Sequence, residues 1–382
     1  MLILLALSLL QAEPAEPAQG QRVIVTGSRI SDDRARLDEC LRRRCPALED
    51  IAASLRLAEN LFVAGAYPEA RSVLAGSIGR NRDEARHSPR AVAGLYRAHA
   101  RVSIHLGEGE AYRRSSHRIV SALAEGLPQD ALDLLMGRVE VGDMQISLGN
   151  ARHAELSYQA VARQAGRAGN AQVEALARLR LAWLRHLIGD ARGAQRQLQA
   201  IAADGTPERS AFGLAARVLL ARIARAGGDH AATDQLLAEL VRRGPQPGLT
   251  LIWAPSPTDS VPRARDPREP GLEGMSYAGF ASRWIDLGFW VRPDGRVQDA
   301  EILRSEGSLG WTGPLLRSVA GRIYAPLEAD PASPGIYRVE RYTYTSLYQV
   351  PGRSRIRTRT GTPRIEQVDL SVDPPSEARP EP

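Results

Sequence analysis

Two cysteines are the residues whose spacing points most directly to a chemistry. Cys40 and Cys45 are the only cysteines of the chain, separated by Leu-Arg-Arg-Arg and followed by Pro46. Without a nearby histidine, two cysteines cannot complete a tetrahedral zinc site, whereas an even pair in an exported protein is typical of a disulfide. A helix broken at Pro46 helps the two side chains to meet. We therefore predict a disulfide between Cys40 and Cys45.

The histidines show no arrangement that would bind a metal or catalyse a reaction. They are scattered singly along the chain, at His87, His99, His105, His117, His153, His186 and His230. No His-x3-His pair, no His-Glu-x2-His pair, no Gly-x-Ser-x-Gly motif and no Gly-x4-Gly-Lys loop occurs in the sequence. The sequence therefore predicts a protein that is not an enzyme and that has no cofactor and no metal site.

Residues 22–30 have the composition of a short strand. The run Val23-Ile-Val-Thr-Gly27 looks like the first strand of a dinucleotide-binding fold, but the glycines of the phosphate turn do not follow it. Dinucleotide binding is therefore excluded. The segment is similar to the Val-Thr-Gly-Ser-Arg strand near the mature N-terminus of many TonB-dependent outer-membrane receptors. The alternative is a plain leader that ends in a short strand.

The first twenty residues are typical of an export signal. An apolar run at residues 2–10 precedes Ala12 and a stretch rich in Pro and Ala. A helix of this length covers about 15 Å of a hydrocarbon core about 30 Å thick, so it cannot span a membrane. We predict a signal peptide at residues 1–20 and a periplasmic protein. Because no positive charge precedes the run, a start further upstream, and with it an inner-membrane anchor, is the alternative.

The charge of the chain does not indicate nucleic-acid binding. The net charge is +6, but all 50 basic residues are Arg and none is Lys. Arg enrichment of this kind reflects GC-rich codon usage, and these residues are spread over helix faces rather than gathered in one patch. We expect no nucleic-acid partner, and membrane contact only if the N-terminal segment is retained as an anchor.

Residues 48–244 have the apolar periodicity of α-helices throughout. Within them, glycines about 40 residues apart each close one apolar helix and open another, at Gly65, Gly107, Gly149, Gly189 and Gly228. The pattern predicts five helical hairpins of a tetratricopeptide-like (TPR-like) α-solenoid. The run Leu61-Phe62-x2-Gly65-x-Tyr67-x2-Ala70 comes closest to the TPR pattern. Later units lose the tyrosine, which leaves the repeat family open.

The C-terminal quarter predicts a β-hairpin, a helix and a third strand. Residues 284–291 and 297–303 are strand-like runs on either side of the turn Pro293-Asp294-Gly295. Apolar residues then recur at helical spacing over 315–324, with Thr312 as the expected N-cap and Pro314 in the first turn. Residues 337–350, rich in Tyr, Val and Thr, predict the third strand.

This order of elements resembles the C-terminal domain of TonB-family energy transducers. The matching motifs are Pro293-Asp294-Gly295-Arg296-Val297, Ser305-Glu306-Gly307 and Tyr324-Ala325-Pro326. The family's usual Leu-Asp-x-Ala-Ala opening of the helix is replaced here by Trp311-Thr312-Gly313-Pro314-Leu315. The alternative is a generic small α+β domain.

The resemblance implies a site that binds a partner strand. In the family the third strand lies at an open sheet edge, where an incoming extended peptide gains main-chain hydrogen bonds. The residues this assigns to partner binding are Arg338, Tyr342, Thr343, Tyr344 and Tyr348. The alternative is that the tyrosines simply pack on the helix.

Taken in order, these segments predict an α+β multidomain protein, a TPR-like α-solenoid followed by a small TonB-like α+β domain. The predicted parts are a signal peptide (1–20), a strand and short helix with the cysteine pair (21–47), the helical-repeat domain (48–244), a Pro-rich linker (245–274), the TonB-like domain (275–365) and a disordered tail (366–382). Within the linker, residues 249–253 predict a short docked strand. The expected partner is a TonB-dependent outer-membrane receptor or another periplasmic protein. The alternative function is a periplasmic scaffold that binds proteins without transducing energy.

Overall fold

The computed structural model describes residues 29–206, 209–244, 248–256, 283–327, 333–349, 357–360 and 362–371. The chain forms two compact units, Met1–Glu239 with Thr345–Pro363, and Leu240–Tyr344 with Arg364–Pro382. The predicted signal peptide, nearly all of the predicted N-terminal strand and most of the predicted linker lie outside the described residues. Ile30, predicted to end that strand, instead begins the first helix.

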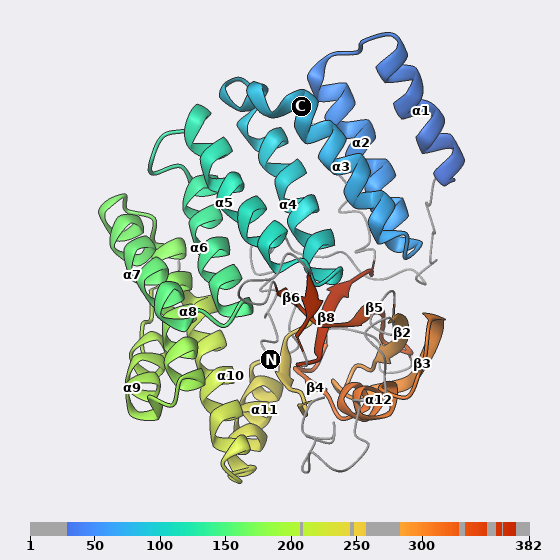
Figure 1. The fold of residues 1–382 in the computed structure, drawn as a ribbon. Helices are drawn as coiled ribbons and strands as arrows, with labels where there is room; N and C mark the ends of the chain where they lie inside the picture. The colour runs from blue at the N-terminus through green and yellow to red at the C-terminus, as the bar shows by residue number, and fades with distance from the viewer. Residues whose placement is uncertain are drawn as a thin grey trace, which may run out of the picture. The chain divides into compact units, whose positions relative to one another are not determined.

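The first unit is an array of helices, in which neighbours along the chain pack side by side (Figure 1). Helix α1 precedes five helical hairpins. The helices are α1 (Ile30–Arg42), α2 (Ala47–Val63), α3 (Tyr67–Asn81), α4 (Pro89–His105), α5 (Gly109–Gly126), α6 (Leu132–Ser147), α7 (Ala151–Arg167), α8 (Ala171–Leu187), α9 (Ala191–Ala202), α10 (Ser210–Ala226) and α11 (Ala231–Arg243), with a 3₁₀ turn η1 (Arg82–Arg86) between α3 and α4.

The five glycines predicted to separate paired helices lie at the turns within the hairpins. All have a positive φ, between 75° at Gly107 and 97° at Gly228. Glycine reaches this left-handed conformation without the steric cost that a Cβ would impose, so it ends the first helix of each pair. At the first turn the Ala66 N–H donates to the Leu61 carbonyl at 2.8 Å, the long bond of a Schellman motif. The predicted helical repeat array is therefore confirmed.

Apolar side chains of successive helices form a continuous core in the array. One buried cluster runs from Leu135 and Val139 of α6 to Phe212 and Leu219 of α10. In the first hairpin, Phe62 contacts Tyr67 and also His105, with ring centroids 4.9 Å apart in both pairs. His105 is therefore a core residue. Each hairpin buries its apolar face against its neighbours in sequence, as expected of a solenoid.

The second unit contains a four-stranded sheet in the order β3-β2-β5-β8. A further pair, β1 with β4, gives the predicted docked strand its partner. The elements are β1 (Leu251–Trp253), β2 (Arg283–Val291), β3 (Val297–Glu306), α12 (Thr312–Ala320), β4 (Ile323–Tyr324), β5 (Ile336–Thr345) and β8 (Arg364–Asp369). The predicted order of hairpin, helix and strand is confirmed, and α12 packs on the apolar side chains of β2 and β5.

Three details of the C-terminal prediction are wrong. The third strand does not continue to residue 350, because β5 ends at Thr345 and a separate hairpin follows, β6 (Tyr348–Gln349) with β7 (Thr358–Arg359). The predicted disordered tail contributes to β8, which pairs with β5. Finally, Trp311 occupies the N-cap of α12, and the Thr312 hydroxyl donates to the Leu309 carbonyl instead of capping the helix.

None of the helices among the described residues is both long enough and apolar enough to cross a bilayer.

Candidate functional site

The strand predicted to bind a partner is not at a sheet edge in this structure. β5 lies between β2 and β8, so both of its edges are paired. At one end of the β5–β8 pair the Leu370 N–H donates to the Val339 carbonyl at 2.8 Å, and Arg338 forms an ion pair with Asp369. The prediction of an open edge at β5 is therefore wrong. It failed because β8 is supplied largely by residues that were predicted to be a disordered tail.

The tyrosines of β5 lie in the core that faces α12. Tyr342 and Tyr344 are 2% and 3% exposed, and Tyr344 stacks on Trp311 with ring centroids 5.3 Å apart. Burial, together with the charge of Glu340, raises the pKa of Tyr342 well above its ordinary value. These two tyrosines thus follow the alternative interpretation, in which they pack on the helix.

The remaining predicted partner-binding residues do not share a surface with them. Thr343 is buried and pairs in register with Trp284 of β2. Tyr348 belongs to β6 in the first unit, where its ring lies 4.5 Å from the Arg357 guanidinium and 4.1 Å from that of Arg359. The structure therefore does not bring the five residues together into one site.

A buried ion pair on β2 was not predicted from the sequence. Asp286 and Arg341 are both fully buried, and the guanidinium holds the carboxylate with two bonds, of 2.6 and 2.9 Å. Arg304 of β3 donates to the same carboxylate at 2.8 Å, and the Arg341 guanidinium also lies 3.8 Å from the centre of the Trp284 ring. The only indication in the sequence was the single carboxylate, Asp286, within the apolar run 284–291, because a buried carboxylate needs a cation to pair with it.

A second buried pair lies on the α12 side of the sheet. Arg322 donates to both oxygens of Glu340 at 2.9 Å and to the Tyr342 hydroxyl at 2.6 Å. Burial lowers the pKa of Arg322, but the charges of Tyr342 and Glu340 outweigh this and raise it well above its ordinary value. Both pairs are buried and bonded internally, although Nε of Arg322 has no partner among the described residues, and each joins neighbouring segments of this unit.

The outer strand β3 presents an exposed edge among the described residues. Seven of its side chains are polar or small, and most of the strand from Gln298 to Glu306 is exposed. Asp299 has a positive φ of 53°, and the register with β2 shifts at two places. Bulges and charged side chains are the usual protection of an exposed edge. This edge can nevertheless accept an extended chain through its main-chain groups.

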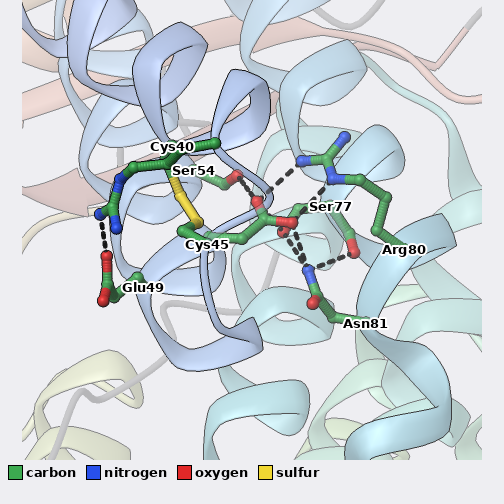
Figure 2. The surroundings of a disulfide bond; sticks show 9 residues. Cys40, Cys45, Glu49, Ser54, Ser77, Arg80 and Asn81 are labelled. Atoms are coloured by element: carbon green, nitrogen blue, oxygen red, sulfur yellow. Dashed lines mark hydrogen bonds and ion pairs between the residues drawn. A yellow bond between two sulfur atoms is a disulfide. The ribbon is translucent and has the colours of Figure 1, made fainter.

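Cys40 and Cys45 form a disulfide at the end of α1, with Cα atoms 5.0 Å apart (Figure 2). Glu49 lies close enough to the two sulfur atoms for the three to resemble a metal-binding group. Sulfur atoms in a disulfide are not thiolates, however, and cannot ligate zinc. At least two of the lone histidines, His99 and His105, pack within the array. For example, burial lowers the pKa of His99, whose Nδ1 lies 2.9 Å from the Ser115 hydroxyl.

Asp50 is the centre of a buried polar network with Ser54, Arg80 and Asn81, whose side chains are labelled in Figure 2. Its carboxylate accepts bonds from Arg80 at 2.7 and 2.8 Å, from Asn81 at 2.7 Å and from Ser54 at 2.8 Å. Burial raises the pKa of Asp50, but the bonds from Arg80, Asn81 and Ser54 outweigh it, so the pKa lies below its ordinary value of 3.8. The network joins α2 to α3 within the first hairpin.

We expect Asp50→Ala to lower the free energy of unfolding of the array by about 2–4 kcal/mol at pH 7. The pKa of Asp50 is lower in the folded chain than in the unfolded chain. The carboxylate therefore stabilises the folded state fully at pH values above its unfolded-state pKa, and this stabilisation is lost as the pH falls below 3.8. Denaturation followed by helical circular dichroism should therefore show a smaller difference in the free energy of unfolding between the wild-type chain and Asp50→Ala at pH 3 than at pH 7. Asp38→Ala, an exposed position on α1, is the control; an equal effect of both variants at pH 7 would contradict the prediction.

A groove of about 530 Å³ lies between α3, η1, α4 and α5. Its apolar lining comes from Ile78, Ala85 and Ala122, and its polar lining includes Tyr96 and Arg118. Burial raises the pKa of Tyr96, while the nearby charges of Arg118 and Arg82 act in the opposite direction. Among the described residues, Arg118 makes no hydrogen bond or ion pair. Only the long connection that contains η1 could have indicated this groove from the sequence.

No protein-family model matches the sequence, and no curated protein matches it. Among solved structures, the chain is similar to BtubC (BKLC) from P. vanneervenii, with 17% identity and a TM-score of 0.45 over 57% of this chain and 92% of that one. It is also similar to a kinesin-light-chain-type protein of Podosopora anserina with nearly identical TPR-like repeats, with 19% identity and a TM-score of 0.40 over 50% of this chain and 93% of that one. The hairpins of this chain, rather than these likenesses, establish its helical repeat array.

Proposed function

We propose that this chain is a non-enzymatic scaffold whose helical array binds another protein. The observation that supports this best is the groove between α3, η1, α4 and α5. Its volume of about 530 Å³ lies within the range of ligand sites. Its lining is mixed: Ile78, Ala85 and Ala122 are apolar, Tyr96 and Ser121 are polar, and Arg82, Asp83, Arg118 and Glu125 are charged. Arg118 brings a positive charge with no hydrogen-bond or ion-pair partner among the described residues. A docked polypeptide segment can insert an apolar side chain and pair an acidic group with Arg118.

The groove is a product of the repeat spacing. Units of about 40 residues exceed the usual TPR unit of about 34, and the extra residues between α3 and α4 include η1. The end of α5 approaches this turn closely, since a Cβ on Gly126 would lie 2.7 Å from the Arg86 carbonyl. Thus η1 is held as a wall of the groove, and the groove does not depend on a mobile loop.

Site-specific crosslinking would test this function. A photoreactive amino acid at Ser121, which is exposed at the groove, should give a discrete adduct with a partner protein in intact cells. Adding Arg118→Glu should reduce that adduct at least about tenfold, because it reverses the charge offered to the partner. The same probe at Ala160, exposed on α7 away from the groove, is the matched control. Identical adducts from both positions would rule out docking at the groove.

The proposed location is the periplasm. Residues 1–20 have the pattern of a signal peptide, and an oxidising compartment suits the disulfide between Cys40 and Cys45. The proposed partner is therefore a periplasmic protein or the periplasmic part of an outer-membrane protein, with no role for nucleic acid.

A second candidate function is capture of the N-terminal strand of a TonB-dependent outer-membrane receptor, as the sequence resemblance implies. The observation that favours it is the pairing of β5 with β8, a strand of only six residues that the C-terminal tail supplies. A receptor strand that displaced β8 would gain the same main-chain partners, and an acidic side chain on it could take the place of Asp369 beside Arg338. Receptor binding at β5 therefore requires release of β8.

A further inference from the structure

One turn of the helical array is covered by the chain's own C-terminal segment. The strap, defined as residues 346–348 and 357–360, lies on the turn between α4 and α5, and both belong to the first unit. The Tyr348 N–H donates to the Gly107 carbonyl at 2.8 Å. Side-chain atoms of Leu347 and Leu148 both lie within van der Waals distance of a Cβ built on Gly109. Arg357 completes the contact, 3.9 Å from the Glu108 carboxylate.

The turn fits this segment closely at Gly107. A Cβ there would lie 2.1 Å from the Ser346 carbonyl and 2.5 Å from Nη1 of Arg359, so no larger residue could keep the strap in place. The equivalent glycines of the next three hairpins, Gly149, Gly189 and Gly228, have nothing within 4 Å of a Cβ among the described residues. All four have a positive φ, so helix termination alone does not explain the close approach at Gly107.

The strap is organised by internal bonds that present one face to the turn. Arg359 is buried and donates to the Thr345 hydroxyl at 2.9 Å and to the Ser346 carbonyl at 2.6 Å. The Thr360 N–H donates to the Leu347 carbonyl at 2.7 Å. The ring of Tyr348 lies against the guanidinium groups of Arg357 and Arg359. In place on the turn, the strap is therefore a small unit held together by its own bonds.

We propose that the surface formed by Gly107, Glu108, Gly109 and Leu148, called here the α4–α5 corner, is a binding site for an extended peptide, which the strap fills in cis. The recognised pattern is a small residue, then Leu, then an aromatic residue, with arginine nearby. The small residue is required by size, since Ser346 is fully buried and its hydroxyl has no partner among the described residues. The Leu packs beside Leu148, and the positive charge faces Glu108.

The α4–α5 corner is separate from the groove that supports the proposed function. A negative result at one of these sites therefore does not contradict the proposal for the other. Among the residues that the structure describes, one main-chain hydrogen bond joins the strap to the corner, and β6 and β7 each contain two residues. Short pairings of this kind open at low free-energy cost. A partner segment with the same pattern can therefore replace the strap, so that the strap limits access to the corner.

A peptide added in trans tests the proposal with the full chain. The probe is a fluorescent peptide with the sequence of residues 345–363. In the strap-released variant, Leu347→Asp with Arg359→Ala, the corner is vacant and the peptide should bind at least about tenfold more tightly than to the wild-type chain, where the strap competes. A peptide carrying Ser346→Ala should bind as well as the probe, and one carrying Leu347→Asp should not bind.

Two glycine variants show whether binding occurs at the corner. Gly107→Ala in the strap-released chain should weaken peptide binding at least about tenfold, because the methyl group occupies the space of the Ser346 carbonyl. Gly149→Ala is the matched control, since its φ of 80° is close to the 75° of Gly107 but its surroundings are open. Should Gly107→Ala unfold the array, Glu108→Arg replaces it and should also weaken binding. Saturable binding that is equal in the wild-type and strap-released chains, or binding indifferent to both corner variants, would overturn the proposal.

Discussion

Replacing Asp286 by alanine is expected to destabilise the C-terminal unit by about 3–5 kcal/mol, the largest effect we predict for a single substitution. The reason is the position of Arg341, whose guanidinium is fully buried between β2 and β5 and bonded to the Asp286 carboxylate at 2.6 Å. Removing the carboxylate leaves that charge without its counter-ion in a site closed to water. Denaturation followed by tryptophan fluorescence reports on this unit, which contains four of the five tryptophans.

The double variant Asp286→Leu with Arg341→Leu should be less destabilised than either single variant. Replacing both partners removes the desolvated charges together, whereas each single substitution isolates one of them. Glu301→Ala, at an exposed position of β3, is the control and should change the free energy of unfolding by about 0.5 kcal/mol or less. Additive losses in the double variant would show that the two side chains do not act as a pair.

Removing β8 is expected to increase the affinity of the C-terminal unit for an extended peptide at least about tenfold. The variant ends at Pro363, and the probe is a labelled peptide with the sequence of residues 23–29, which is similar to a receptor strand. Without β8, the main-chain groups of β5 that face it become free to pair with the peptide. Titration of the peptide into the full chain and into the shortened chain measures the difference.

A proline at Thr343 in the shortened chain should abolish this gain. The Val339 carbonyl accepts a bond from Leu370, so Val339 directs its main-chain groups toward β8, and Thr343, four residues further on, directs its own toward the same edge. Proline there removes the donor that the peptide would use. If the full and shortened chains bound the peptide equally, the hypothesis that β5 binds the peptide would be wrong. The exposed edge of β3 would then be the next candidate for the binding site.

The parts of the fold that follow from local sequence were predicted, and the parts that depend on distant pairing were not. The spacing of Gly65, Gly107 and the later glycines predicts helical hairpins because the left-handed conformation ends each helix locally. The hairpin at Pro293-Asp294-Gly295 follows in the same way from turn chemistry. Neither pattern contains information about which strand will lie beside β5.

The predicted partner-binding site on the third strand depends most on this missing information. The alternation of Tyr342 and Tyr344 correctly places both side chains on one face of a strand, but whether that face meets α12 or a partner depends on how the elements around the strand pack, which its own pattern does not show. The pairing of β5 with β8 and the contact of the strap with Gly107 are both of this kind. The sequence thus predicts which residues share a face and leaves open what covers it.

The bond between Tyr348 and Gly107 also has a consequence for how the protein is assembled. The two residues are about 240 positions apart in the chain, whereas the hairpins of the array bring together neighbours in sequence. Local contacts form in microseconds to milliseconds, while closing so long a loop costs more entropy and has to wait for the C-terminal residues to arrive. We therefore expect the array to fold first, with its α4–α5 corner open during that interval. If the corner is the binding site proposed above, a partner segment would meet no competition from the strap in a newly made chain.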